Sequence, residues 1–326
     1  MDIAKVKEVI GHELTKVNDI IAKSLNSDIT LLNKVNNSIL QSSGKQMRPI
    51  LALLVAKACN AGNITDATIR YAAATELLHN ASLLHDDVAD NSDCRRGRPT
   101  INKLMGPSIS VLVGDYWLVK AMSLILRDSN DDYRVLNIFS KTLRELAEGE
   151  MLQLQKAQSC DTQDEDYYRI IYSKTGSLFE AAIKTAAISV GASTQVIESM
   201  VKYAVSLGTA FQIKDDILDY DGTASVGKPL GVDIQEQKIT IPLLGAFRNV
   251  PMEKELQIRR KIKDIGEEDC REEIIAFVKD NGGLDFALME LERFVDEAVN
   301  ALGILPESKE KQFLIDMAHY TALREK

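Results

Sequence analysis

The sequence predicts an all-α fold, a single-domain bundle of roughly a dozen helices. Apolar residues recur at three- and four-residue spacing over long stretches, whereas strand-like alternation is scarce. Only 7 prolines and 18 glycines occur among the 326 residues, and they gather in a few places. No linker rich in glycine, serine or proline marks a boundary, so we expect residues 1–326 to form one domain.

The helices can be placed in order from their periodic stretches and from their start and stop signals. Clear periodic stretches are YAAATELLHNASLL at 71–84 and VLNIFSKTLRELAEGEMLQL at 135–154. Capping residues or first-turn acids predict helix starts at Asn63–Asp66, Ser129–Asp132, Asp161–Asp166 and Pro306–Ser308. Turn-forming residues predict breaks near Gly44, Gly97–Pro99, Gly106–Pro107, Gly222–Gly231, Pro251 and Gly282–Gly283.

Composition and charge exclude several classes of function. The net charge of −9 lacks the basic footprint that binds nucleic acid. No run of about 18 apolar residues is present, so we expect no transmembrane anchor. The charged, amphipathic N-terminus has no apolar signal core, which favours a cytoplasmic protein. The four cysteines show no paired or metal-type spacing and suit reduced thiols.

Two short acidic motifs share the pattern Asp-Asp-apolar-x-Asp, namely HDDVAD at 85–90 and KDDILD at 214–219. Residues four apart lie on one face of a helix, so the first and last aspartates of each motif point the same way. Such like charges repel unless a cation lies between them, and oxygen ligands favour Mg²⁺. A lone copy is more simply a solvated acidic face. Two copies, each at the end of an apolar helix, instead predict acidic clusters that share one cavity and bind metal.

Basic residues stand beside these motifs or at predicted helix ends, where they favour a phosphate-bearing ligand. Arginine binds phosphate through two parallel hydrogen bonds. One such base alone is usually a surface charge, and only several bases at similar positions indicate a binding site. These bases are Arg95, Arg96, Lys45, Arg48, Lys174, Lys228 and Lys238. His79 lies seven residues before Asp86 on nearly the same helix face, although a lone histidine there is usually a core residue.

Taken together, these residues resemble the all-α trans-isoprenyl diphosphate synthases, also called polyprenyl synthetases, over most of the chain. The motifs follow that family's order and spacing: GKQMRP, LLHDDVAD with RRGRPT, VGDYWL, EGEMLQL, KTGSLF, FQIKDDILDY, GKPLGVDIQEQKITIP and NGGLDFA. The resemblance implies a helical bundle around a central substrate cavity. It also implies a homodimeric enzyme that adds isopentenyl diphosphate head to tail to an allylic diphosphate, with three Mg²⁺ ions bound.

The resemblance assigns an expected role to each matching residue. The expected magnesium ligands are Asp86, Asp90 and Asp215. The residues expected to support them, directly or through water, are Asp87, Asp216 and Asp219. Residues that resemble those gripping the allylic diphosphate are Arg95, Lys174, Gln212, Lys228 and Lys238. Residues that resemble those gripping isopentenyl diphosphate are Lys45, Arg48, His79 and Arg96.

Three further positions bear on the same resemblance. Thr175 matches a threonine near the reacting allylic carbon, and Phe211 would lie against the isopentenyl group. Gln46 departs from the family, which often has a second base there. Because Lys45 and Arg48 are still present, we expect this departure to have at most a modest effect.

Small side chains just before the first acidic motif predict a long product. In the family a bulky aromatic residue there stops the growing chain early, and a small residue lets it pass. Ala81 and Ser82 lie about 6 to 7.5 Å below Asp86 along the helix and resemble the long-chain pattern, with Leu78 and Phe139 as candidate floors. The product would then have octaprenyl length, built on farnesyl diphosphate for quinone side chains. The plainer alternative is that Ala81 and Ser82 are small because two helices pack closely there.

Other proteins of the same fold are alternatives. A short-chain synthase would stop at farnesyl or geranylgeranyl diphosphate. Terpene cyclases share the fold and the first motif, but they usually replace the second and lack the isopentenyl-site bases. A non-catalytic partner subunit should have lost its aspartates and bases. The intact motif at 214–219 and the GKQMRP segment therefore favour an active synthase.

Overall fold

The computed structural model describes residues 3–41, 44–95, 97–127, 133–221, 230–266 and 270–324, and it confirms the all-α prediction. Among these residues the only strands are β1 (Cys94–Arg95) and β2 (Arg98–Pro99), which pair antiparallel. In chain order the helices are α1 (Ile3–Ser24), α2 (Thr30–Gln41), α3 (Met47–Cys59), α4 (Asp66–Ala89), α5 (Ile101–Met105), α6 (Pro107–Ile125), α7 (Tyr133–Ser159), α8 (Asp164–Ile171), the π-helical turn η1 (Tyr172–Gly176), α9 (Ser177–Ser189), α10 (Thr194–Asp221), α11 (Val232–Gln235), α12 (Ile241–Phe247), α13 (Met252–Lys263), α14 (Arg271–Asp280), α15 (Gly283–Ala301), the 3₁₀ turn η2 (Leu302–Ile304) and α16 (Lys309–Leu323).

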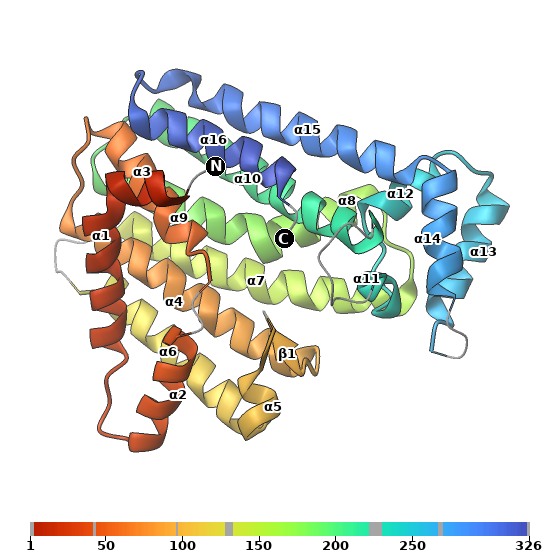
Figure 1. The fold of residues 1–326 in the computed structure, drawn as a ribbon, viewed down its shortest axis with the longest axis horizontal. Coiled ribbons are helices and arrows are strands. Elements are labelled where there is room, and N and C mark those ends of the chain that lie inside the picture. The colour runs from red at the N-terminus through yellow and green to blue at the C-terminus, as the bar shows by residue number, and fades with distance from the viewer. Residues whose placement is uncertain are drawn as a thin grey trace.

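The long helices are stacked in layers around two buried ones, α4 and α10 (Figure 1). α4 packs against α6 and α9, and α10 packs against α9 and α15. α1 crosses the bundle at one end, and the short helices α11 to α14 gather at the other (Figure 1). The C-terminal end of the chain returns to the middle of the bundle, close to α10.

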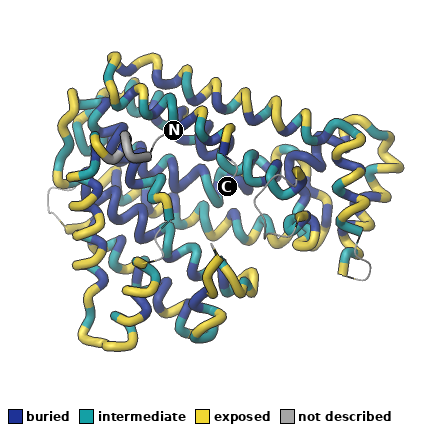
Figure 2. The backbone as a smooth tube through the Cα atoms, in the orientation of Figure 1, coloured by how far each residue is buried: buried dark blue, intermediate teal, exposed yellow. Residues whose placement is uncertain are grey.

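The apolar side chains form one continuous core that runs from Val6 in α1 to Ala318 in α16. Its buried residues are concentrated along α3, α4, α9 and α10, whereas the outer faces of α13 and α15 are exposed (Figure 2). The two helices that carry the acidic motifs are therefore fixed by packing along most of their length.

The helix starts follow the predicted capping signals. Thr65 caps α4, and its side chain and that of Thr68 each bond the other's backbone N–H. Gln163 precedes α8 with a similar reciprocal bond to Asp166, and Ser308 caps α16. The predicted start at Ser129–Asp132 lies outside the described residues.

α8, the π-helical turn η1 and α9 follow one another without a break, and glycines in two neighbouring helices fit against that turn. A Cβ at Gly149 of α7 would lie 2.5 Å from the Cβ of Ser173, and a Cβ at Gly208 of α10 would lie 2.9 Å from the Cα of Gly176. Neither contact leaves room for a side chain. Close backbone approach therefore holds the turn between α7 and α10, and π-turns of this kind are frequent at functional sites.

α6 is the one described helix that bears on the expectation of no transmembrane anchor. Its 19 residues, Pro107–Ile125, are long and apolar enough to cross a membrane by length and composition alone. The same test is passed by core helices of proteins that do not span a membrane. One face of α6 is buried against α4. Trp117, on α6, also donates to the side chain of Asn36 on α2 at 2.8 Å.

Candidate active site

The first acidic motif ends α4, and its three aspartates face different surroundings. The backbone N–H of Asp90 bonds the carbonyl of Asp86 at 2.8 Å, so the helix continues to the last aspartate. Asp87 is buried and accepts a 2.8 Å bond from Nε of Arg95. Burial raises the pKa of Asp86 to about 6, while the charges of Lys174 and Arg95 oppose this and those of Glu150 and Asp90 add to it.

The second acidic motif lies in the last turns of α10. Asp215 is ion-paired with Arg324, with 2.8 Å between Oδ1 and Nη2. Asp216 is buried and accepts bonds from the Tyr167 hydroxyl at 2.6 Å and from Nε2 of Gln212 at 3.0 Å. Burial raises the pKa of Asp216 well above its usual range.

Asp219, the third aspartate of this motif, binds backbone rather than side chains. Its two carboxylate oxygens accept the N–H groups of Val232 at 3.1 Å and Asp233 at 3.0 Å. These N–H groups begin the short helix α11, where an anion is favoured by the orphan donors. Asp216 and Asp219 thus have protein partners of their own, which suits their predicted supporting role.

The π-helical turn η1 presents two of the predicted residues. Nζ of Lys174 pairs with Oε2 of Glu150 on α7 at 2.6 Å, and both side chains are mostly buried. The Thr175 hydroxyl donates to Oε1 of Gln212 on α10 at 3.1 Å. Two helices, α7 and α10, therefore meet this turn through side-chain bonds as well as through the glycine contacts described above.

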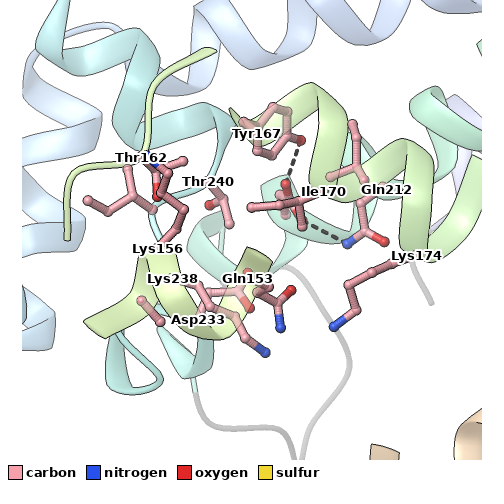
Figure 3. A pocket seen from close by; sticks show the side chains of 14 residues that line it. Gln153, Lys156, Thr162, Tyr167, Ile170, Lys174, Gln212, Asp233, Lys238 and Thr240 are labelled. Atoms are coloured by element: carbon pink, nitrogen blue, oxygen red, sulfur yellow. Dashed lines mark hydrogen bonds between the residues drawn. The ribbon is translucent and has the colours of Figure 1, made fainter. Parts of the chain in front are cut away.

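These elements surround one pocket, shown from close by in Figure 3. Lys174 and Gln212 line it from one side, and Asp233 and Lys238 line it from the other (Figure 3). Asp216, which accepts a bond from Gln212, lines it as well. The remaining lining residues are Gln153, Lys156, Ala157, Thr162, Tyr167, Ile170, Ile171, Ile239 and Thr240. Three of the residues expected to grip an allylic diphosphate therefore meet in this pocket beside the second acidic motif.

The first acidic motif belongs to the same site. Lys174 acts electrostatically on Asp86, and Asp90 acts on Lys238, so each end of the motif is close to a pocket lysine. Burial lowers the pKa of Lys238, but the charges of Glu236 and Asp233 outweigh it and the net shift is upward. Lys238 therefore keeps its positive charge between the two motifs.

Comparisons with known proteins agree with this geometry. The family model described as Polyprenyl synthetase matches residues 29–279. The chain belongs to the polyprenyl synthetase family. It is 38% identical to the octaprenyl diphosphate synthase of Haemophilus influenzae over 99% of this chain and 98% of that protein. Its predicted class, a prenyltransferase that makes polyprenyl diphosphate, is confirmed.

Two solved structures of polyprenyl synthetases share the fold. The decaprenyl diphosphate synthase of Rhodobacter capsulatus superposes with a TM-score of 0.92, at 33% identity over 99% of each chain. A polyprenyl synthase of Caulobacter crescentus, complexed with calcium and isoprenyl diphosphate, gives a TM-score of 0.89 at 30% identity, over 100% of this chain and 98% of that one. The predicted family fold is confirmed along the whole length.

The described residues that are predicted to bind isopentenyl diphosphate in this polyprenyl synthetase do not line the pocket of Figure 3. Lys45 donates to the Tyr320 hydroxyl at 3.2 Å, and the guanidinium of Arg48 stacks on the ring of Phe179 at 4.7 Å. Phe179 in turn packs against Phe211, with 6.0 Å between ring centroids. His79 is half-buried on α4. Arg96 and Lys228 lie outside the described residues.

The structure adds residues that the sequence prediction missed. Glu150 stands in the EGEMLQL motif, so its place in a matching segment was a usable signal. Asp233, which lines the pocket, likewise stands in the GKPLGVDIQEQKITIP motif. Tyr167, which donates to Asp216, lies in none of the quoted motifs. Arg324 is a base near the end of the chain with no motif around it, and only the tertiary fold brings it to Asp215.

The residues predicted to set chain length are packed side chains of the polyprenyl synthetase core. Leu78, Ala81 and Phe139 are buried, and Ser82 donates to the carbonyl of His79 at 2.9 Å. None of these four residues lines the pocket of Figure 3. Their role in product length therefore stays a prediction, and close helix packing is still an alternative.

The acidic residues fit a divalent cation that is completed by substrate. In the described part of the chain, no group of three or more His, Cys, Asp or Glu side chains is close enough to hold a metal alone. The available donors are carboxylate oxygens, which suit a hard cation whose remaining positions are filled by water and diphosphate. Burial raises the pKa of Asp86 to about 6, so a cation beside this carboxylate would stabilise its charged form.

The free-energy cost of burying the Asp86 charge can be tested through the pH dependence of protein stability. The folded protein binds the Asp86 proton more tightly than the unfolded chain, so this contribution to stability is full below pH 3.8 and is lost as pH rises through about 6. Asp86→Asn removes the charge. In chelator at pH 7 we expect Asp86→Asn to be more stable than wild type by on the order of 2 kcal/mol, measured by urea unfolding.

The advantage of Asp86→Asn should shrink towards zero at about pH 4, where wild-type Asp86 is protonated. Asp296→Asn, at an exposed aspartate on α15, is the matched control for removing one negative charge. A stability difference that is the same at both pH values would contradict the assignment of a poorly compensated charge.

Proposed function

We propose that this polyprenyl synthetase condenses isopentenyl diphosphate with an allylic diphosphate, repeatedly, to give an all-trans product of octaprenyl length. Farnesyl diphosphate is the proposed primer, quinone side chains the proposed use, and the cytoplasm the proposed location. The observation that carries the reaction is the single pocket in which Lys174, Gln212 and Lys238 lie beside Asp216 and within electrostatic reach of Asp86 and Asp90. Full-length similarity to an octaprenyl diphosphate synthase supports the product length.

The metal in this proposal is Mg²⁺, held by Asp86, Asp90 and Asp215, with three ions present once diphosphate is bound. When bound, the ions supply positive charge that stabilises diphosphate as a leaving group. Oxygen donors and the calcium found in a solved relative support a hard divalent cation.

The protein's own residues account for the rest of the proposed mechanism. Lys174 and Lys238 attract the allylic diphosphate and stabilise its charge as its C–O bond breaks and it leaves with the electron pair. Ile170, Ile171 and Ile239 give the pocket apolar walls that keep water from the allylic cation. The alkene of isopentenyl diphosphate then supplies the electron pair of the new C–C bond, and a proton is lost to the released diphosphate.

The reaction is tested with isopentenyl diphosphate, farnesyl diphosphate and Mg²⁺, with the products resolved by chain length. Asp86→Ala and Asp215→Ala should each lower turnover by about 100-fold or more, because each removes a charge that holds the leaving group's counter-ions. Asp296→Ala on α15 is the control and should leave turnover unchanged. An active Asp86→Ala enzyme would overturn the metal assignment.

Product length is tested by filling the space before the first motif. Ala81→Tyr places a bulky aromatic where the growing chain is proposed to pass, so its products should be shorter than those of wild type. Ala147→Tyr, at an exposed alanine of α7, is the control for adding the same side chain elsewhere. If wild type itself stops at farnesyl or geranylgeranyl diphosphate, the enzyme is a short-chain synthase. If Ala81→Tyr leaves the length unchanged, position 81 does not limit it.

We further propose that the enzyme is a homodimer joined through the outer face of α6. Leu112 and Val119, seven residues apart on that face, are 67% and 60% exposed, which supports an apolar surface that a second copy covers. Leu112→Glu with Val119→Glu should shift wild-type dimers to monomers in sedimentation velocity. Met289→Glu, at a comparably exposed residue of α15, should not. A monomeric wild type would contradict the proposal.

A further inference from the structure

Arg324 follows the last turn of α16 and points into the active site. Its backbone N–H bonds the carbonyl of Tyr320 at 3.0 Å, which fixes the residue at the end of the helix. Its Nη2 donates both to Oδ1 of Asp215 at 2.8 Å and to the carbonyl of Phe211 at 2.7 Å. The guanidinium also stacks on the ring of Phe211 at 3.8 Å. The C-terminal end of the chain therefore supplies a cation to the second acidic motif.

This cation depends on Asp215 for its charge balance. The Arg324 side chain is 6% exposed, and a buried guanidinium is costly without a counter-charge. Its Nε is buried and has no hydrogen-bond partner, so the guanidinium is only partly satisfied where it lies. Asp215 is 44% exposed and can be reached from the solvent side. The pair thus joins a shielded cation to an accessible carboxylate.

Other ion pairs of the site differ in which carboxylate they use. Arg95 pairs with Asp87, and Lys174 pairs with Glu150; neither of these acids is a proposed metal ligand. Arg324 instead occupies an oxygen of Asp215, which is one. A metal ion at Asp215 must therefore compete with the guanidinium, since two cations at one carboxylate repel each other.

We propose that Arg324 is a resident counter-ion of Asp215 that the metal displaces, so that this ion pair sets the metal affinity of the second acidic motif. The inference rests on the proposed role of Asp215 as a metal ligand. In the metal-free enzyme Arg324 holds the Asp215 carboxylate in place and limits the repulsion within the motif. When metal and diphosphate enter, the ion pair opens, and the cost of opening it is subtracted from the binding free energy.

The test measures binding without turnover. Mg²⁺ is titrated by calorimetry into protein with inorganic pyrophosphate present, for wild type, Arg324→Gln and Arg324→Lys. Losing the competing charge should tighten Mg²⁺ binding by about threefold to tenfold in Arg324→Gln, the range expected for a partly buried ion pair. Arg324→Lys keeps a positive charge and should lie closer to wild type. Arg293→Gln, at an arginine paired with Glu290 and Glu297 on α15, is the matched control and should bind as wild type does.

A second comparison separates a local effect from a general loss of structure. In an Asp215→Asn background the substitution Arg324→Gln should no longer change Mg²⁺ affinity, because the partner charge is gone. If wild type binds no Mg²⁺ with pyrophosphate, the proposed function itself fails. If wild type binds and Arg324→Gln binds equally or more weakly, Arg324 does not compete with the metal, and the inference is overturned.

Discussion

Carboxylates at the ends of two core helices, some of them buried, need positive charge beside them, and the arrangement of this site follows from that constraint. Packing of α4 against α6 and α9, and of α10 against α9 and α15, fixes where Asp86, Asp90 and Asp215 lie. Nearby bases supply this positive charge: Arg95 is ion-paired with Asp87, and Arg324 is ion-paired with Asp215. Burial still raises the pKa of Asp86 to about 6, so its negative charge is only partly balanced by the protein. In the proposed mechanism, the divalent cation that enters with diphosphate supplies the positive charge that the protein itself lacks.

Much of the fold and a good part of the site could be predicted because they depend on local patterns. The capping residue Thr65, the three- and four-residue spacing of α4, and the position of Asp86 and Asp90 at its end are all local. The resemblance also assigned Lys174, Gln212 and Lys238 to one diphosphate site, and the structure brings the three into one pocket. The four-residue spacing of a helix is enough to predict which side chains lie together when those residues are close in the sequence.

The remainder depends on tertiary contacts that leave no signal in a single sequence. The pairs Lys174–Glu150 and Arg324–Asp215 join segments far apart in the chain, and each base taken alone resembles an ordinary surface charge. The π-helical turn at 172–176 depends on backbone contact with Gly149 and Gly208, so it could not be read from the KTGSLF motif itself. The hydrophobic content of α6 was underestimated because two charged residues, Asp115 and Lys120, interrupt an otherwise apolar helix.

The bonds of Asp219 connect two parts of the active site that are separate in the chain. The chain leaves α10 just after Asp219 and returns at Gly231, whose N–H bonds the carbonyl of the same aspartate at 3.0 Å, while its carboxylate holds the next two N–H groups. One residue thus ties the last turns of α10 to the start of α11. Lys238 comes shortly after α11, and its backbone N–H bonds the carbonyl of Asp233 at 2.8 Å. Asp219 therefore links the second acidic motif to the position of a pocket lysine, so a change at this one carboxylate would reach both parts of the site.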